Sequence, residues 1–290
     1  MLIYYDSRCA EYATLGHPEA PFRAAATADV LRHQEPGWQW ERPVAASREE
    51  IVRVHTAHHW DRLATPRDFD ADTPYIEGIR DHAARAAGGA LAVARQALAG
   101  VRAFSLMRPP GHHACADEAM GFCYLNSVAL AAFEARALGA ERVAVFDFDA
   151  HHGNGTQDIL AHKPGLCYGS VHQYPCYPGT GGTSFDNIVN AHIPPEGARD
   201  EHMMALGKVW RQLLAFQPSL ILVSAGFDAY RDDPLTEMSL EENDFHTLGC
   251  WLRECGLPVG AILEGGYSRD LPELVLAFLR GWEGAPAPRL

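Results

Sequence analysis

Residues 142–157 read RVAVFDFDAHHGNGTQ, and this stretch decides the fold class. Its first half is a strand-length apolar run rich in β-branched and aromatic residues, and its second half contains two glycines. An apolar run that ends in acids and glycine is typical of a strand from a parallel sheet, which is buried on both faces. We therefore expect a strand over 142–149 with polar groups at its carboxyl end.

Four other apolar runs of similar length occur, and amphipathic segments with helical periodicity alternate with them. The further strands are expected at 101–107, 165–172, 219–228 and 258–266. The helices are expected at 22–32, 76–99, 126–138, 199–216, 241–255 and 271–280, with a short one after the SxxE capping box of Ser47 and Glu50. This alternation predicts a single α/β domain over 1–290, a central, mostly parallel sheet flanked by helices on both faces, and a frayed tail over 283–290.

The bulk composition suits one large soluble domain. The chain has 290 residues, of which 47% are hydrophobic, enough to bury a sizeable core. The first residues carry no basic start, and no segment approaches the ~20 apolar residues of a membrane helix. Seven cysteines without a CxxC pair predict reduced thiols rather than disulfides. We expect a cytoplasmic protein without membrane association.

The net charge argues against nucleic acid as a partner. A formal charge of −13 repels phosphate groups, and no Lys/Arg-rich run offsets it locally. A cationic substrate or peptide would be tolerated better. The charge indicates neither an oligomeric state nor a protein partner.

Polar side chains lie at the carboxyl end of every predicted strand or just after it. Because ligands bind outside the carboxyl ends of parallel strands, these residues should meet at one edge of the sheet. They are His112 and His113 after the first strand, Asp147, Asp149 and His151 after the second, Ser170 and His172 after the third, Asp228 after the fourth and Tyr267 after the last.

The acids among these residues predict a metal site. Strand alternation puts Asp147, Asp149 and His151 on one face, where two carboxylates repel each other unless a cation lies between them. Asp228 supplies a third ligand from a separate strand, which leaves room for water as in catalytic zinc sites. Iron(II) is an alternative to zinc. A solvated acidic loop, with Asp228 capping a helix, is the non-functional interpretation.

Paired histidines and a tyrosine can supply acid-base chemistry beside a metal. The PPG turn before His112 and His113 fixes them at a strand end, where a bound water needs a base with a pKa near neutrality. Tyr267 could donate its hydroxyl to an oxyanion, although an aromatic residue after glycines is often packing. We interpret the other pair, His58 and His59, as a surface or helix-end feature.

Nine motifs in register resemble the zinc-dependent histone deacetylases, closer to class II than to class I, as in bacterial histone deacetylase-like amidohydrolases. They are HPEAPFR (17–23), RPPGHHA (108–114), MGFCYLN (120–126), DFDAHHGNGTQ (147–157), SVHQ (170–173), YPGTG (177–181), SAGFDA (224–229), DPL (233–235) and LEGGY (263–267). The resemblance implies an arginase/deacetylase-like fold and a zinc-dependent deacylase acting on N-acetyl- or N-acyl-lysine in proteins or peptides, or on a related small acyl-amide.

The resemblance also implies a role for each matching position. The zinc ligands would be Asp149, His151 and Asp228, the general base and acid His113, its electrostatic partner His112, and the carbonyl-polarising donor Tyr267. Asp147 would orient His112, Asn154 would lie beside His113 where many members have Asp, and a structural potassium ion would be bound by Asp147, Asp149, His151, Ser170 and Val171. The substrate would contact Asp72 at the rim, Gly121, Phe122 and Tyr177 along a tunnel, and Leu235, while Arg23 would line an internal channel.

Three other functions are compatible with parts of this pattern. Acetylpolyamine amidohydrolases of the family use an acidic gatekeeper, where this chain has Leu235. A catalytically silent acyl-lysine-binding module would lack a ligand or the tyrosine, and here none is lost. An arginase-like dimanganese hydrolase would need further Asp and His ligands, where this chain has His112, His113 and Tyr267 instead.

Overall fold

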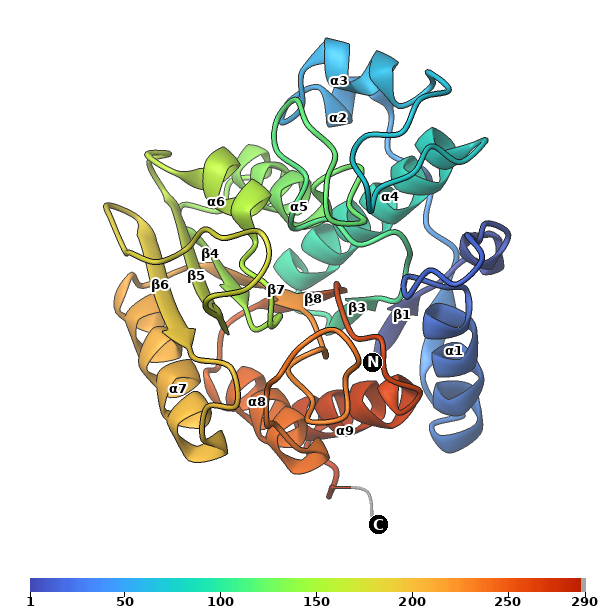
Figure 1. Cartoon of the computed structure of the whole chain (residues 1–290). Helices are drawn as coiled ribbons and strands as arrows, with labels where there is room; N and C mark the ends of the chain where they lie inside the picture. Colours follow the sequence, from blue (N-terminus) through green and yellow to red (C-terminus); the bar gives the residue numbers. More distant parts are fainter. Residues whose placement is uncertain (288–290) are drawn as a thin grey trace.

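The computed structural model describes residues 1–287, and its central element is one open sheet of eight parallel strands (Figure 1). The expected mostly parallel sheet is confirmed, because each pairing between neighbouring strands in this part of the chain is parallel. From one edge to the other the strands are β2 (Gln39–Glu41), β1 (Leu2–Tyr4), β3 (Ala103–Ser105), β8 (Val259–Leu263), β7 (Leu220–Ala225), β4 (Val143–Asp147), β5 (Leu166–Gln173) and β6 (Ile188–Ile193).

Helices cover both faces of the sheet (Figure 1). One layer contains α1 (Phe22–Gln34), α7 (Arg199–Ala215), α8 (Glu242–Glu254) and α9 (Leu271–Glu283), and the other contains α4 (Ile79–Leu98), α5 (Ser127–Ala137) and α6 (Asn154–Leu160). The short helices α2 (Arg48–Ile51) and α3 (Ala57–Arg62) lie at the outer end of α4, and a 3₁₀ turn, η1 (Ser7–Ala10), follows β1. The six long helices expected from periodicity are all present.

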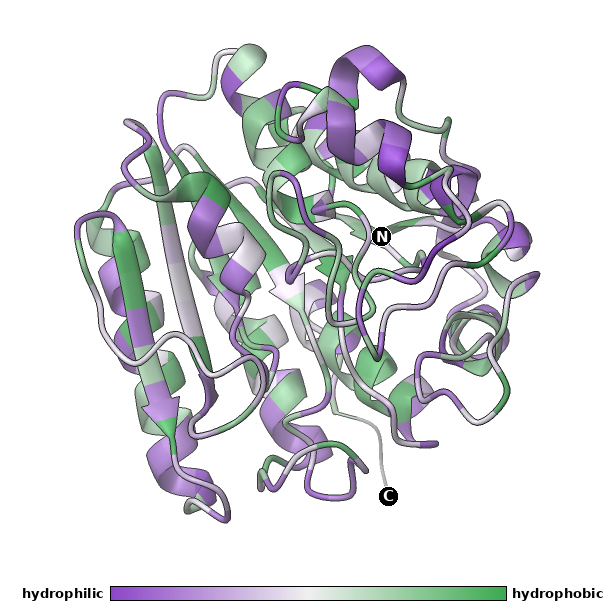
Figure 2. Cartoon of the chain, turned by 45° about the horizontal axis from the view of Figure 1, so that its top comes forward, coloured by the Kyte–Doolittle hydropathy of each residue, from purple (hydrophilic) through white to green (hydrophobic). Residues whose placement is uncertain are grey.

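The core explains why the central strands are apolar throughout. In β4, Ala144 and Phe146 pack into the cluster beneath α7, α8 and α9, whereas Val143 and Val145 pack into the cluster beneath α4 and α5. Figure 2 shows the strands at the centre as mainly hydrophobic and the outlying α2–α3 segment as mainly hydrophilic. Burial on both faces makes continuous apolar runs the signature of this sheet.

Three strands, β1, β2 and β6, and two helices, α3 and α6, have no counterpart in the sequence prediction. β1 and β2 contain only three residues each, and β6 is a half-exposed edge strand whose polar residues hide its pattern. The strand expected at 101–107 shortens to Ala103–Ser105. The α6 helix begins at Asn154, where two flanking glycines obscure the helical periodicity.

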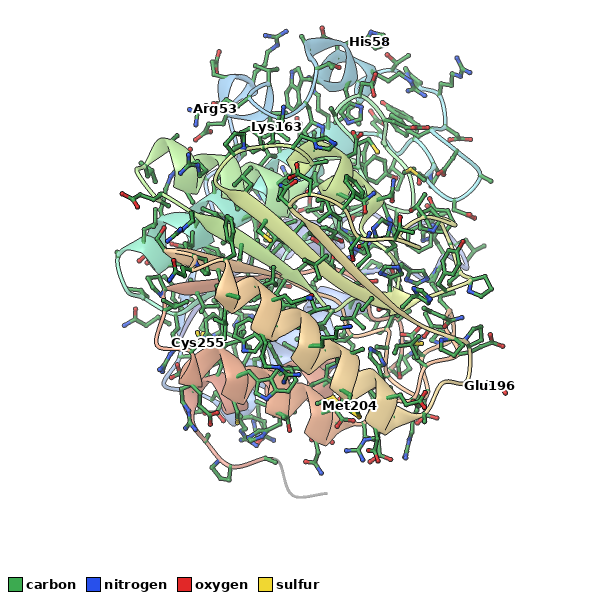
Figure 3. All side chains as sticks on the ribbon, turned by 90° about the vertical axis from the view of Figure 1, so that its left-hand side faces the viewer. Arg53, His58, Lys163, Glu196, Met204 and Cys255 are labelled. Carbon is green, nitrogen blue, oxygen red and sulfur yellow. The ribbon has the colours of Figure 1, made fainter. Side chains whose placement is uncertain are left out.

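The second histidine pair divides between surface and core. Both residues lie in α3, and His58 is at the periphery of the molecule (Figure 3). His59 is buried, and its Nε2 is 2.7 Å from the carbonyl oxygen of Tyr124. Both residues lie in the first turn of α3, as the helix-end interpretation expects, but the surface interpretation is correct only for His58, because His59 is on the inner face of the helix.

The chain end is ordered further than expected. Glu283 still belongs to α9, and the backbone N–H of Ala285 donates to the carbonyl of Arg280. The frayed tail predicted for 283–290 is therefore wrong at its start, and 288–290 lie outside the described residues. The seven cysteines are free thiols, as expected. Within residues 1–287, no helix has the length and apolar character needed to cross a membrane.

Two glycines allow α8 and α9 to approach closely. A Cβ on Gly249 of α8 would overlap the carbonyl oxygen of Phe278, and one on Gly281 of α9 would overlap that of His246. Both positions are in helix interiors, where glycine is otherwise unfavourable by up to about 1 kcal/mol. Close packing of the two helices offsets this cost.

We predict that Gly249→Ala destabilises the protein by about 2 kcal/mol or more, because the added methyl group forces the two helices apart. Gly207→Ala in α7 is the matched control. Its Cβ would meet only the flexible end of Arg211 at 3.3 Å and Trp251 at 3.6 Å, so a gain of about 0.5 kcal/mol is expected. Urea unfolding measures both changes, and equal stabilities would contradict the packing account.

Candidate active site

The predicted polar residues meet at one edge of the sheet. The strands β3, β8, β7 and β4 are consecutive neighbours, and the segment after each carries part of the site. The residues so gathered are His112 and His113 after β3, Tyr267 after β8, Asp228 after β7, and Asp149 and His151 after β4. All six are buried, with Tyr267 and His151 the most exposed at 8% and 9%.

Asp149, His151 and Asp228 form the candidate metal site. Their ligand atoms all lie within 4.8 Å of one another, and no other such group of three occurs among residues 1–287. His151 Nδ1 is 2.9 Å from Asp228 Oδ2 and 3.3 Å from Asp149 Oδ1. The arrangement does not follow strand alternation, because β4 ends at Asp147. Instead, Asp147 Oδ1 accepts the N–H of Asp149, and Asp149 Oδ1 accepts the N–H of His151.

The charges in this cluster fit a bound cation. Asp149 and Asp228 are fully buried. Burial, and after it the nearby charge of Asp149, raise the pKa of the Asp228 carboxyl to about 7, so two charged carboxylates are disfavoured here. A divalent cation would remove that repulsion. Two carboxylates and one imidazole leave coordination positions open for water and substrate, as in catalytic rather than structural zinc sites.

The two histidines of the GHH turn differ in their partners. His112 Nδ1 is 3.2 Å from Asp147 Oδ2, whereas His113 Nδ1 is 2.8 Å from Asn154 Oδ1. Burial opposes the charged form of His112, but the carboxylates of Asp149 and Asp147 outweigh it and raise its pKa to about 10. Burial above all, and then the nearby charge of His112, lower the pKa of His113 well below its usual value. The pKa values of the two adjacent histidines are therefore shifted in opposite directions.

Tyr267 is held above a buried arginine. Arg23 lies with its guanidinium carbon 4.8 Å from the centre of the tyrosine ring, and its Nε donates to the carbonyl of Gly266 at 2.6 Å. The edge of the Phe122 ring contacts the same tyrosine, with ring centres 5.7 Å apart. Arg23 is therefore placed beneath the site, where its internal-channel role remains a prediction.

A cavity of about 400 Å³ leads from the surface to these groups. Phe122 and Tyr177 both line it, and Gly121 allows close packing there, since a Cβ on Gly121 would lie 2.6 Å from the His113 ring and 2.9 Å from Tyr177. Both Gly121 and Phe122 have left-handed backbone angles, with φ of 57° and 68°, which is uncommon for phenylalanine. The N–H of Phe122 donates to Thr73 Oγ1 and holds this turn.

The mouth of the cavity contains the predicted rim residues. Asp72 and Leu235 both line it, and the exposed fractions of Leu235 and Tyr177 are 37% and 38%. Asp70, which the sequence did not single out, accepts the N–H groups of Asp72 and Gly121 and so braces the rim. His17 also lines the cavity, although only its motif, not its position, was noted from the sequence.

The residues predicted for a potassium ion lie behind the metal site. Asp147 and Ser170 are register partners on adjacent strands β4 and β5, and both are buried. Asp147 Oδ2 accepts a hydrogen bond from the Tyr168 hydroxyl, and Ser170 Oγ is 2.9 Å from His172 Nδ1. Val171 follows Ser170 in the same buried strand.

Two buried acids that the sequence did not identify support this edge of the sheet. Glu264 Oε2 accepts the N–H groups of Gly111 and His112, so it fixes the turn that presents the histidines. Glu19 binds both Arg23 and Arg108, which joins the N-terminal segment to the arginine beneath Tyr267. Both acids lie in quoted motifs, but only burial and backbone contacts reveal their roles.

Comparison with known proteins gives a consistent result. A family model described as "Histone deacetylase domain" matches residues 17–281. A probable deacetylase from Methanothermobacter thermautotrophicus is 38% identical over 286 residues, which cover 93% of this chain and 86% of that protein.

Two solved structures are similar over nearly the whole chain. The HDA15 HD domain gives a TM-score of 0.91 at 31% identity and covers 98% of this chain and 91% of its own. An acetylpolyamine aminohydrolase from Burkholderia pseudomallei gives a TM-score of 0.84 at 29% identity, with 97% and 98% covered.

We predict that the protein binds one divalent cation per chain and that Asp228→Asn abolishes stoichiometric binding, because a neutral amide is a weak ligand and leaves Asp149 without its partner. Asp232→Asn, on an exposed neighbour in the same loop, is the matched control and should bind normally. Elemental analysis after incubation with zinc and gel filtration measures this. Two ions per chain, or full binding by the Asp228 variant, would contradict the assignment.

Proposed function

The chain belongs to the histone deacetylase family, and we propose that it is a zinc-dependent deacylase that hydrolyses N-acetyl- or N-acyl-lysine in peptides or proteins, or a related small acyl-amide. The observation that carries this proposal is the convergence of three groups at the end of one cavity. These are the donors of Asp149, His151 and Asp228, the neutral imidazole of His113 and the hydroxyl-bearing ring of Tyr267. Hydrolysis of an amide needs an electrophilic centre, a base and a donor for the oxyanion.

A zinc ion bound by Asp149, His151 and Asp228 would polarise the amide carbonyl and lower the pKa of a water molecule. The protein's own contribution begins with the cavity walls. The aromatic rings of Phe122 and Tyr177 in the cavity wall offer apolar surface that suits the aliphatic chain of an acyl-lysine. Asp72 at the mouth is available for N–H groups of a bound peptide backbone.

His113 can take and return the proton. Its lowered pKa keeps it neutral at physiological pH, so it can accept a proton from the attacking water and pass it to the leaving amine. Asp147 beside His112 favours the protonated form of that imidazole, whereas the neutral Asn154 accepts a hydrogen bond from His113. The Tyr267 hydroxyl then donates to the carbonyl oxygen as that oxygen gains negative charge.

Acetylpolyamines are the alternative substrates. The similarity to an acetylpolyamine aminohydrolase over 97% of this chain favours this alternative. The uncharged Leu235 at the mouth favours acyl-lysine, because a polyamine would gain from an acid at that position. A silent binding module is the least supported function, since every predicted metal ligand and the tyrosine are present and close together.

Two further assignments complete the proposal. We propose one catalytic domain, because a single sheet joins strands from residue 2 to residue 263. We also propose that a potassium ion binds beside Asp147 and Ser170, where buried acid and hydroxyl oxygens lie on adjacent strands. Carbonyl oxygens of Asp149, His151 and Val171 would complete its coordination.

Tyr267→Phe and His113→Ala should each lower turnover by roughly 10²- to 10⁴-fold while zinc remains bound, because one loses the donor to the oxyanion and the other the base. Steady-state assays with an acetyl-lysine peptide and parallel metal analysis measure this. Tyr230→Phe removes a hydroxyl that bonds to Asp270 instead and should remain active. Near-normal activity of either site variant would refute the proposed roles.

A substrate panel tests the proposed function itself. Lysine peptides with acetyl, trifluoroacetyl and longer acyl groups are compared with acetylpolyamines, each with and without a chelator. We expect hydrolysis of acyl-lysine peptides that the chelator abolishes and added zinc restores. Faster hydrolysis of acetylpolyamines would support the alternative, and no hydrolysis of any acyl-amide would exclude the proposed function.

A further inference from the structure

One buried carboxylate connects the catalytic tyrosine to the rim of the cavity. Asp233 lies in the loop between Asp228 and Leu235, and its exposed fraction is 6%. Its Oδ2 accepts the backbone N–H of Tyr267 at 2.7 Å and that of Ser268 at 3.2 Å. Its Oδ1 accepts the backbone N–H of Leu235 at 3.0 Å. One side chain thus holds two segments that are more than thirty residues apart in sequence.

We infer that Asp233 is a positioning residue for Tyr267 and that it couples the placement of this tyrosine to the rim residue Leu235. The inference rests on the proposed function, in which Tyr267 donates to the substrate carbonyl. Asp233 itself does not line the cavity, so it acts on the substrate only through its neighbours.

The backbone before Tyr267 explains why such a restraint is needed. Gly265 and Gly266 precede the tyrosine, and Gly266 has a φ of 114°, a conformation that only glycine adopts easily. Two consecutive glycines have few steric restraints of their own, so hydrogen bonds must fix the backbone here, and Arg23 and Asp149 already bind the carbonyl of Gly266 and the N–H of Gly265. Arg23 and Phe122 contact the ring of Tyr267, but the hydrogen bonds to its own N–H and to that of Ser268 come from Asp233.

The chemistry of the contact requires a carboxylate. Two oxygens accept three N–H groups, and hydrogen bonds to a charged acceptor are about twice as strong as neutral ones. An asparagine offers only one accepting oxygen. Its NH₂ group would face either the backbone N–H of Leu235 or those of Tyr267 and Ser268, and neither contact could then be a hydrogen bond. Asp233→Asn therefore frees one of the two segments while it changes the size of the side chain very little.

The test compares Asp233→Asn with Asp232→Asn in the zinc-loaded full-length protein. Asp232 is the exposed neighbour, and its carboxylate pairs with Arg231. We measure kcat and KM with an acyl-lysine peptide that the wild-type protein hydrolyses. We also measure inhibition by a trifluoromethyl ketone analogue of that peptide, whose hydrate resembles the tetrahedral transition state. Misplacement of Tyr267 should lower kcat of the Asp233→Asn variant by roughly 10- to 100-fold and leave KM little changed. Binding of the inhibitory analogue should weaken by a similar factor.

A double variant separates positioning from general stability. In the Tyr267→Phe background, adding Asp233→Asn should lower the residual single-turnover rate no further, because the hydroxyl that Asp233 positions is already absent. If Asp233→Asn lowers the rate of the Tyr267→Phe protein by the same factor as it lowers that of the wild-type protein, the inference is overturned. It is also overturned if folded, zinc-loaded Asp233→Asn keeps the wild-type kcat, or if the substitution changes only KM.

If Asp233→Asn does not fold, Asp233→Glu is tested in its place. It keeps the charge but moves the carboxylate by one methylene group, so its kcat should also fall, and wild-type kcat would overturn the inference. Failure of the proposed function looks different, because the wild-type protein would then hydrolyse no acyl-amide at all.

Discussion

The opposition of two buried carboxylates, Asp149 and Asp228, is the constraint on which the site depends. Like charges at this depth are tolerated only if cations and hydrogen-bond donors surround them. The chain supplies N–H groups from Gly265 to Asp149 and from Ala150 to Asp228. Gly226 and Gly265 carry no side chain where a Cβ would overlap these acids. The segments that follow β4, β7 and β8 therefore surround two buried negative charges, and a bound divalent cation would balance them.

These charges also shift the pKa values of the two neighbouring histidines in opposite directions. Asp149 and Asp147 raise the pKa of His112, whereas burial and the charge of His112 lower that of His113. His113 meets the neutral Asn154 instead of an acid. The difference between these two adjacent histidines follows from the groups that each one contacts rather than from their position in the sequence.

The sequence was sufficient for the elements and residues that share a regular pattern. Apolar runs located five neighbouring strands of the sheet, β3, β8, β7, β4 and β5, and the rule that ligands bind at strand ends brought Asp149, His151 and Asp228 together. It could not reveal β6, whose half-exposed face breaks the pattern, nor the burial of His59. It also missed Asp233 and Glu264, since an acid that serves backbone N–H groups carries no signal of its own until the fold shows it buried. The motifs around them contained the only hint.

We propose that Asp149, His151 and Asp228 hold one catalytic metal ion beside His113 and Tyr267. Anomalous diffraction at the zinc absorption edge, from crystals of the zinc-loaded protein, tests this most directly. We expect a single strong peak coordinated by His151 Nδ1 and one oxygen of each aspartate, at the inner end of the cavity. A peak elsewhere, or two peaks in the cluster as in a dinuclear hydrolase, would contradict the account.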